Sequence, residues 1–333
     1  MRKDRASAPA RPSQCSETRR TPRSGPSGPL TVEIVDGKLC LVTIMARKRK
    51  TICSRELSEP IARPVLKWAG GKQWLAPAAR LLMPPDFDGR YWEPFLGGGA
   101  FFFALSPKRA TLSDKNEELI QAYRALRDDP EAVVTLLRRH RYKYGFYYRT
   151  RRRVPRSPQG VAARMIYLNR TCWNGLYRVN RQGQFNTPFG RLVNPTICDS
   201  DRLDAAARKL RTAQVRVGDF AEIVGKAEPG DWVYLDPPYI TGHRNNGFLK
   251  YNAQLFTWAD QKRLAQCAKG LVEKGVHVIV TNADHGRVVS LYAGFRYYRV
   301  TRASLVGVGS SRGTVTEALL SSYPILGYES AKD

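Results

Sequence analysis

The sequence predicts an α/β fold in which a doubly wound, parallel sheet carries an inserted, mostly helical module. Short apolar segments alternate with helical patterns along residues 64–126 and again along 214–330. Polar residues directly follow several of these segments, as expected where strands end at the ligand-binding edge of an open sheet. Between the two stretches, residues 127–213 break this rhythm, which indicates a separate module.

The individual elements follow from local patterns. The apolar segment 91–95 runs into a glycine turn at 96–99 and then into an apolar helix, and further helices are expected at 116–126 and 258–273. The other expected strands are 110–113, 214–217, 232–235, 276–280 and 317–321. Polar groups follow four of them: Asp114, Asp219, the AspProProTyr segment at 236–239, and Thr281 with Asn282.

Residues 1–63 differ from the rest in composition. They contain 14 Lys and Arg against 6 Asp and Glu, and Pro, Ser, Arg and Gly are concentrated in the first 29 residues. Such a segment buries too little apolar surface to order itself, so we expect a basic and largely disordered extension with one short strand at 39–45. The α/β domain then comprises 64–126 and 214–330, and the insert comprises 127–213.

Charge narrows the class of partner. The chain has 333 residues, with 55 Lys and Arg against 29 Asp and Glu, and a net charge of +26. This field favours a polyanion, with nucleic acid first and an anionic membrane surface second. No basic amphipathic helix with apolar anchors supports the membrane alternative. Nine basic residues, five aromatic residues and no acid lie within 138–156, as expected of a surface that follows phosphates.

Other features exclude further classes. No apolar run approaches the roughly 18 residues of a membrane helix, and no signal-peptide core follows the basic N-terminus. We therefore expect a soluble protein of the cytoplasm. Six cysteines form no Cys-x-x-Cys pair and only four histidines occur, so we expect neither a metal site nor a disulfide framework.

The AspProProTyr segment at 236–239 is the sharpest chemical signal. Two prolines fix the backbone and offer no N–H donor, which leaves a carboxylate, carbonyl oxygens and an aromatic face. These groups suit an exocyclic amine on a flat ring. The alternative is an ordinary turn after a strand, because Asp and Pro favour turns.

Two further segments indicate a ligand. The glycine turn at 96–99 permits close approach of a ligand at a helix N-terminus, and Asp114 lies where an acid can bind ribose hydroxyls. The alternative for Asp114 is a cap on the following helix. LysTrpAlaGlyGlyLys at 67–72 adds two cations and an aromatic ring, or is a plain loop. The polar loop 241–252 is expected either to close over a bound base or to be a surface loop.

Six segments occur in one order that resembles a known family. They are LysTrpAlaGlyGlyLys at 67–72, GluProPheLeuGlyGlyGlyAlaPhe at 93–101, LeuSerAspLysAsn at 112–116, AsnGlyLeuTyrArgValAsn at 174–180, PheAsnThrProPheGlyArg at 185–191 and AspProProTyr at 236–239. Together they resemble the Dam family of DNA adenine-N6 methyltransferases, the D12 class, over residues 64–325. The resemblance implies a Rossmann-like S-adenosylmethionine-dependent methyltransferase sheet with an inserted DNA-recognition domain.

The resemblance also implies roles for individual residues. The positions that it assigns to S-adenosyl-L-methionine are Trp68, Lys72, Glu93, Phe95, Gly97, Gly99, Asp114, Asp219, Phe220 and Asp236. Catalysis would use Asp236 and the Pro237 carbonyl as acceptors for the amine, with Tyr239 stacking on a flipped adenine and no metal. The positions that it assigns to DNA are Trp173, Leu176, Arg178, Asn180, Pro188 and Arg191.

A GATC-like site fits these positions, because Arg reads guanine, and Leu or Pro can contact the thymine methyl group. Leu192 departs from the family pattern, which has an aromatic residue there, and this leaves either recognition of an outer base pair or phosphate contact alone. The alternative for Arg178 and Arg191 as readers is that they only neutralise phosphates. The alternatives for function are an N4-cytosine or RNA amine methyltransferase and an inactive DNA-binding homologue. We expect a monomer that acts on double-stranded DNA in a bacterial nucleoid or a phage-infected cell, in a restriction-modification, regulatory or phage-borne role.

Overall fold

A computed structural model describes residues 62–180, 182–239, 256–303 and 314–325, together with the backbone of three strands between 30 and 53. One sheet organises the molecule, with strand order β6-β5-β4-β7-β8-β10-β9. Its strands are β4 (Tyr91–Glu93), β5 (Ala110–Asp114), β6 (Ala213–Val217), β7 (Trp232–Leu235), β8 (His277–Ala283), β9 (Arg296–Ala303) and β10 (Thr314–Ser321). The predicted α/β class is confirmed, and this mixed sheet is consistent with an S-adenosylmethionine-dependent methyltransferase fold.

The sheet is not wholly parallel, which corrects the sequence prediction. Strands β4 to β8 pair in parallel, but β10 runs antiparallel to both β8 and β9. Strand β9 was not predicted from the sequence. Buried and exposed residues alternate along it, so it has no apolar run, and its pairing with β10 is what defines it as a strand.

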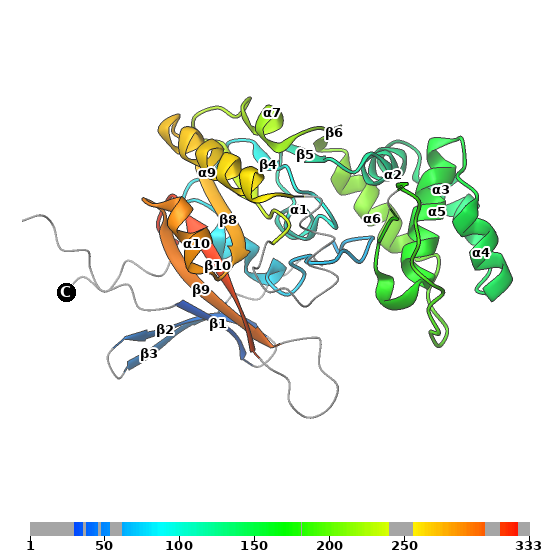
Figure 1. Cartoon of the computed structure of the whole chain (residues 1–333), viewed down its shortest axis with the longest axis horizontal. Coiled ribbons are helices and arrows are strands. Elements are labelled where there is room, and N and C mark those ends of the chain that lie inside the picture. The colour runs from blue at the N-terminus through cyan, green and yellow to red at the C-terminus, as the bar shows by residue number, and fades with distance from the viewer. Residues whose placement is uncertain are drawn as a thin grey trace, which may run out of the picture.

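Two layers of helices cover the sheet (Figure 1). On one face, α7 (Phe220–Val224), α9 (Trp258–Glu273), α10 (Gly286–Val289) and the 3-10 turn η3 (Ser290–Tyr292) pack on side chains such as Val233 and Val280. On the other face, α1 (Ala100–Leu105) and the 3-10 helix η1 (Ala76–Leu82) pack on Tyr91 and Tyr234. The ring of Phe101 stacks on that of Tyr234 at 4.0 Å between centroids.

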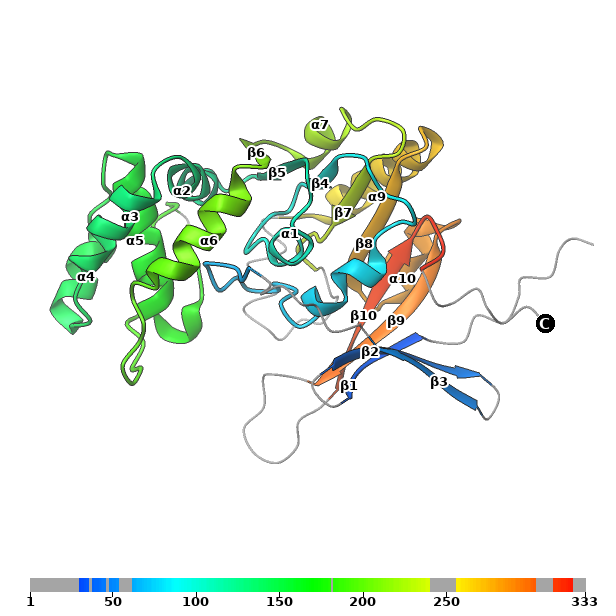
Figure 2. The same ribbon diagram turned by 180° about the vertical axis from the view of Figure 1, so that it is seen from behind.

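Most of the remaining helices form a group beside the sheet (Figure 2). They are α2 (Glu117–Asp128), α3 (Pro130–Arg138), α4 (Tyr144–Arg152), α5 (Pro158–Thr171), the short 3-10 turn η2 (Trp173–Gly175) and α6 (Ser200–Leu210). Their buried side chains join the core on the α1 side of the sheet, so Leu168 and Leu112 belong to one apolar cluster. The two parts therefore share a continuous core, and the boundaries at 126/127 and 213/214 stay predictions.

A second, three-stranded antiparallel sheet lies below β9 in Figure 1 and consists of β1 (Leu30–Val35), β2 (Lys38–Met45) and β3 (Lys48–Cys53). The strand expected at 39–45 is confirmed, whereas its two neighbours were not expected. Strand β1 also contacts β9. Residues 1–29, 54–61 and the loop 241–252, for which the sequence analysis made predictions, lie outside the described residues.

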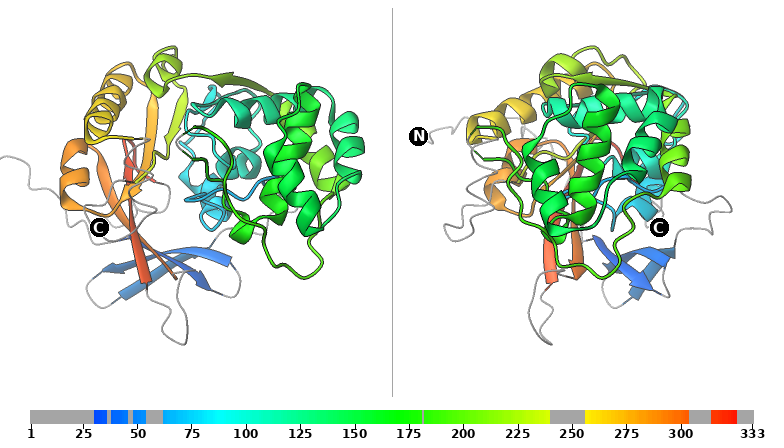
Figure 3. Two further views of the ribbon diagram at one scale, coloured as in Figure 1. Left: turned by 45° about the vertical axis from the view of Figure 1, so that its right-hand side comes forward. Right: turned by 90° about the vertical axis from the view of Figure 1, so that its right-hand side faces the viewer.

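Two views in Figure 3 show the arrangement that places the site. The strand order reverses between β4 and β7, so their carboxyl ends flank the point at which open α/β sheets bind ligands. The helical group stands next to this edge. Within the part of the chain that is described, no helix is both long and apolar enough to cross a membrane.

Candidate active site

The turn after β4 is held by the carboxylate at the end of the neighbouring strand. Gly97 has a φ of +45°, and its N–H donates to Asp114 Oδ2 at 3.0 Å. Asp114 Oδ1 accepts from the Asn116 N–H at 2.9 Å, while Asn116 itself caps α2 through the Leu119 N–H. Asp114 is therefore not the helix cap of the alternative interpretation. It fixes the glycine turn, and loss of water around it raises the pKa of its carboxyl group.

The same turn leaves no room for a side chain. A Cβ atom at Gly97 would lie 2.6 Å from Cδ1 of Trp68, which is too close for any residue but glycine. The Trp68 ring also stacks on Tyr177 of the helical group, at 5.1 Å between centroids. Trp68, the glycine turn and the helical group thus meet at one place.

Glu93 at the end of β4 is 3% exposed and points into the protein. Its Oε2 accepts from the Tyr91 hydroxyl at 2.9 Å and from the Phe102 N–H in α1 at 3.1 Å. Burial raises the pKa of Glu93 to about 8, so the carboxyl group is mostly protonated at neutral pH. Its hydrogen bonds join β4 to α1, next to the turn that the resemblance assigns to the cofactor.

Asp236, directly after β7, lies next to Lys72, although 164 positions separate them in the sequence. The Lys72 ammonium group is 2.8 Å from Asp236 Oδ1 and 3.0 Å from Oδ2, and it donates to the Gly70 carbonyl at 2.7 Å. Thr281 Oγ1, at the end of β8, donates to Asp236 Oδ1 at 2.8 Å. Burial raises the pKa of Asp236, and Lys72 opposes that shift.

Tyr239 completes this group. Its ring lies 4.6 Å from the Lys72 ammonium nitrogen, and its hydroxyl donates to Glu317 Oε2 at 2.7 Å. Glu317 belongs to β10, is 5% exposed, and lies 3.6 Å from the Lys72 nitrogen. Lys72, Asp236 and Tyr239 were candidate site residues from the sequence, whereas Glu317 was not. The available signal was an acidic residue at the start of an otherwise apolar predicted strand.

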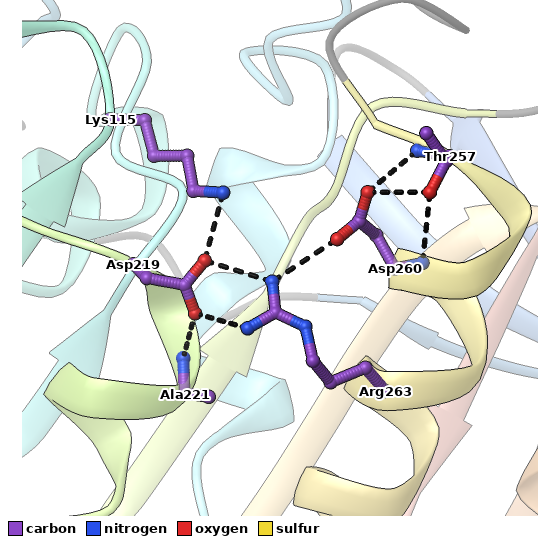
Figure 4. A network of polar contacts seen from close by, with 6 residues as sticks. All are labelled: Lys115, Asp219, Ala221, Thr257, Asp260 and Arg263. Atoms are coloured by element: carbon purple, nitrogen blue, oxygen red, sulfur yellow. Dashed lines mark hydrogen bonds and ion pairs between the residues drawn. The ribbon is translucent and has the colours of Figure 1, made fainter.

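The resemblance places Asp219 and Phe220 near the adenine of the cofactor. Asp219 belongs to a polar network at the start of α7 (Figure 4). Asp219 binds Arg263 through two hydrogen bonds of 2.7 and 2.9 Å and lies 2.8 Å from Lys115. Arg263 holds the pKa of Asp219 well below its usual range. Phe220 is buried between the Phe95 ring, at 5.4 Å, and the Arg263 guanidinium, at 4.3 Å.

Asn169 in α5 joins the loop 67–72 to the helical group through hydrogen bonds, and it was not predicted from the sequence. Its Oδ1 accepts from the Lys67 N–H at 2.8 Å, and its Nδ2 donates to the carbonyls of Lys67 and Gly175 at 2.8 and 3.0 Å. Gly175 has a φ of +64°, and a Cβ there would lie 2.6 Å from Lys67 Cδ. The segment around Lys67 therefore has a fixed position against the segment around Trp173.

The residues that the resemblance assigns to DNA lie mostly on the surface. Trp173 is 55% exposed, and Arg178, Pro188 and Arg191 are exposed, whereas Leu176 is half-buried. Arg178 Nε donates to Asn186 Oδ1 at 2.8 Å, which orients the guanidinium group. Trp173 and Pro188 are joined by a backbone hydrogen bond of 2.9 Å.

Asn180 has a local role in the structure. Its Oδ1 accepts from the backbone N–H groups of Gln182 and Gln184, at 3.0 and 2.9 Å, and its Nδ2 donates to the Gln184 side chain at 3.0 Å. It therefore shapes the turn that joins residues 179 and 185. Leu192, at the position that departs from the family pattern, is 40% exposed, and its N–H donates to the Tyr142 hydroxyl at 2.6 Å.

The basic segment 138–156 forms an exposed face along the end of α3 and α4. Eight of its nine cations are exposed, the exception being the half-buried Arg151, which donates to the Thr187 carbonyl at 3.2 Å. A cavity of about 400 Å³ at the start of α4 is lined by Arg141, Lys143, Gly145, Phe146 and Arg149. In the described residues, no cluster of three or more His, Cys, Asp or Glu side chains could hold a metal ion.

Known proteins resemble this chain over most of its length. Residues 68–304 match the model of the D12 class N6 adenine-specific DNA methyltransferases. A type II methyltransferase of Lactococcus lactis subsp. cremoris is 39% identical over 272 residues, which is 78% of this chain and 95% of the relative. A type II methyltransferase of Methanocaldococcus jannaschii is 32% identical over 73% of this chain and 92% of the relative. The DNA adenine methylase of Escherichia coli (strain K12) is 32% identical over 77% and 94%.

Proposed function

Because the chain belongs to the D12 class N6 adenine-specific DNA methyltransferase family, we propose that it transfers the methyl group of S-adenosyl-L-methionine to N6 of adenine in a GATC-like site of duplex DNA. The observation that carries the proposal is the group at the carboxyl end of β7. There, a half-buried carboxylate, Asp236, and an aromatic ring, Tyr239, follow a strand next to the one that ends in a glycine turn, which only a glycine backbone can form.

The residues present fit the proposed methyl donor. The glycine turn allows the Trp68 ring to pack against its backbone, the half-buried Asp114 carboxylate beside it can accept from ribose hydroxyls, and the half-buried Phe95 supplies aromatic surface. The bound cofactor supplies an electrophilic methyl group. The chain supplies the orientation of the acceptor amine relative to that group.

Asp236 performs the central step in this proposal. An adenine in a duplex cannot present its amine in line with a methyl donor, so the base is flipped out of the stack. The Asp236 carboxylate and the Pro237 carbonyl then accept hydrogen bonds from the two N6–H groups, which turns the nitrogen lone pair toward the methyl group. Thr281 keeps the carboxylate oriented through its 2.8 Å hydrogen bond to Oδ1, and the flipped base stacks on Tyr239.

Lys72 has two relations to this step. In the structure its ammonium group binds the Asp236 carboxylate and lies over the Tyr239 ring, where the amine and the base are proposed to bind. The incoming amine therefore shares or displaces this contact. Lys72 also favours the ionised form of Asp236, which accepts hydrogen bonds, against the burial that raises the pKa of this carboxyl group.

Recognition uses the exposed surface of the helical group. Arg178 is proposed to read guanine through O6 and N7, and Leu176 and Pro188 to contact the thymine methyl group. Trp173 fills the gap left by the flipped base. Leu192 replaces the aromatic residue of the family pattern. Either Arg191 then contacts the outer base pair, or this part of the surface binds phosphate alone.

The test is methylation of two unmethylated duplexes with labelled S-adenosylmethionine, one with GATC and one with that site scrambled. Label on the GATC duplex alone, recovered as N6-methyladenine after digestion, supports both the reaction and its specificity. Label on both keeps the reaction and makes Arg178 and Arg191 phosphate contacts. Label recovered as N4-methylcytosine, or no label on either duplex despite binding, contradicts the proposal.

A further inference from the structure

Glu317 lies in the active site, although the matched family model ends at residue 304. Its carboxylate accepts from the Tyr239 hydroxyl at 2.7 Å, and 78 positions separate the two residues in the sequence. The hydrogen bonds that hold Asp236 and the glycine turn do not involve this pair. It connects β10 to the aromatic ring on which the flipped adenine is proposed to stack.

The backbone of Glu317 is firmly anchored. Strand β10 lies between β8 and β9, and Glu317 pairs with Ala283 on one side and Val300 on the other. Tyr239, in contrast, belongs to an irregular segment after β7. Its side chain can swing about the Cα–Cβ bond unless the far end is held, and the hydroxyl at that end donates to a buried carboxylate. Hydrogen bonds to a charged acceptor of low exposure are among the stronger ones in proteins.

The other contact of the ring depends on the same residue. The Lys72 ammonium group lies 4.6 Å from the centre of the Tyr239 ring and 3.6 Å from Glu317 Oε2. A side chain that swung about the Cα–Cβ bond would leave both the carboxylate and the ammonium group. Glu317 and Lys72 therefore favour one rotamer of Tyr239, with the hydroxyl held at β10.

We infer that Glu317 is a positioning residue, which holds the Tyr239 ring in the orientation for stacking on the flipped adenine. The inference rests on the proposed function and adds a residue to it. Glu317 touches neither the base nor the methyl group in this scheme and acts through the phenol hydroxyl. Its loss should therefore lower turnover on DNA much more than it lowers binding of the cofactor.

A double-mutant cycle on the full chain tests this. Glu317→Gln removes the charged acceptor, and Tyr239→Phe keeps the stacking ring but removes the hydroxyl. Each change should lower kcat/KM on the GATC duplex by roughly tenfold to a hundredfold, the effect of losing a hydrogen bond to a charged group. The kcat/KM of the double variant should equal that of the less active single variant within about twofold, because both changes break the same contact. Glu273→Gln, at an exposed position on α9, is the matched control and should retain activity.

A second readout does not depend on catalysis. With 3-fluorotyrosine at position 239, the fluorine resonance of the otherwise unchanged chain should be a single narrow line, and Glu317→Gln should broaden or split it. Additive losses in the cycle, full activity of Tyr239→Phe, or an unchanged resonance in Glu317→Gln would each overturn the inference. If Glu317→Gln does not fold, Tyr239→Phe alone decides. An unsubstituted chain that shows the narrow line but methylates no duplex contradicts the proposed function and not the position of the ring.

Discussion

The carboxyl edge of the sheet and the surface of the helical group contrast in how their charged residues are held. At the edge, Lys72 is 3% exposed and Glu317 5%, and both contact groups that come from distant strands. On the helical group, Trp173 is 55% exposed, and Arg178 and Arg191 are exposed. The groups proposed to react are thus held in place without DNA, whereas the groups proposed to read DNA are exposed to water until DNA covers them.

Substitutions in the two regions should therefore differ in how much activity they remove and in whether the loss depends on the DNA sequence. Removing a partner from the buried edge leaves another charged group without compensation, so the loss is large and independent of the DNA sequence. Removing an exposed cation costs less, and its effect depends on the salt concentration or on the base pair it contacts.

The largest effect is expected at Asp236. Asp236→Asn removes the charge that Lys72 binds and places an N–H donor where an acceptor is needed, so methylation should fall by about a thousandfold or more. Cofactor binding should partly survive. Methylation rates and cofactor titration of this variant check the prediction, with the exposed Asp201→Asn as control. Near-normal turnover of Asp236→Asn would contradict the proposal that the edge of the sheet contains the reacting groups.

Glu93 should make stability depend on pH. Its carboxyl group has an ordinary pKa of 4.5 when unfolded and a pKa of about 8 when folded. Only the unfolded chain releases this proton between those values, so stability is greatest below pH 4.5, falls as pH rises to 8, and then levels off. The decline should be on the order of a few kcal/mol.

Glu93→Gln should flatten this part of the stability curve, because the amide does not titrate. Urea unfolding at several values from pH 5 to 9 measures it, and Glu222→Gln, an exposed change in α7, should leave the slope unaltered. A slope in Glu93→Gln equal to that of the unsubstituted chain would show that the proton loss belongs to other groups.

Arg178→Ala should have an intermediate effect that depends on sequence. If Arg178 reads guanine, its loss should cost about 1–3 kcal/mol of discrimination at that base pair, and the GATC duplex should lose its advantage over single-base variants. Competition methylation with those variants measures the change. Lys262→Ala removes an exposed cation from α9 and should keep the preference. A uniform loss over all duplexes would instead make Arg178 a phosphate contact.

The smallest effect per residue is expected on α4. Arg149→Ala and Arg152→Ala should each weaken binding equally for all DNA sequences and lower the dependence of log affinity on log salt by about one unit. Binding titrations between 50 and 200 mM salt, as a rough range, check this. Salt slopes equal to that of the unsubstituted chain would show that this exposed face does not follow the phosphates.

Much of the framework follows from short stretches of sequence. The strand at 232–235 and the helix at 258–273 have the predicted bounds, because an apolar run before AspProPro and the pattern after Thr257 define both ends locally. Thr257 and Asp260 form a reciprocal cap, so this helix begins where its own sequence requires. The polar residues after each strand likewise indicated which edge of the sheet carries the chemistry.

The pairings between distant segments, in contrast, could not be predicted from local patterns. The antiparallel insertion of β10 between β8 and β9, the Lys72–Asp236 contact and the Asn169 clamp on Lys67 each join residues that no local period relates. The Tyr239–Glu317 hydrogen bond belongs to the same class. Local sequence patterns predicted which polar side chains follow the strands. Strand order and packing decided which of those groups meet, because side-chain contacts across a sheet depend on pairing and not on position along the chain.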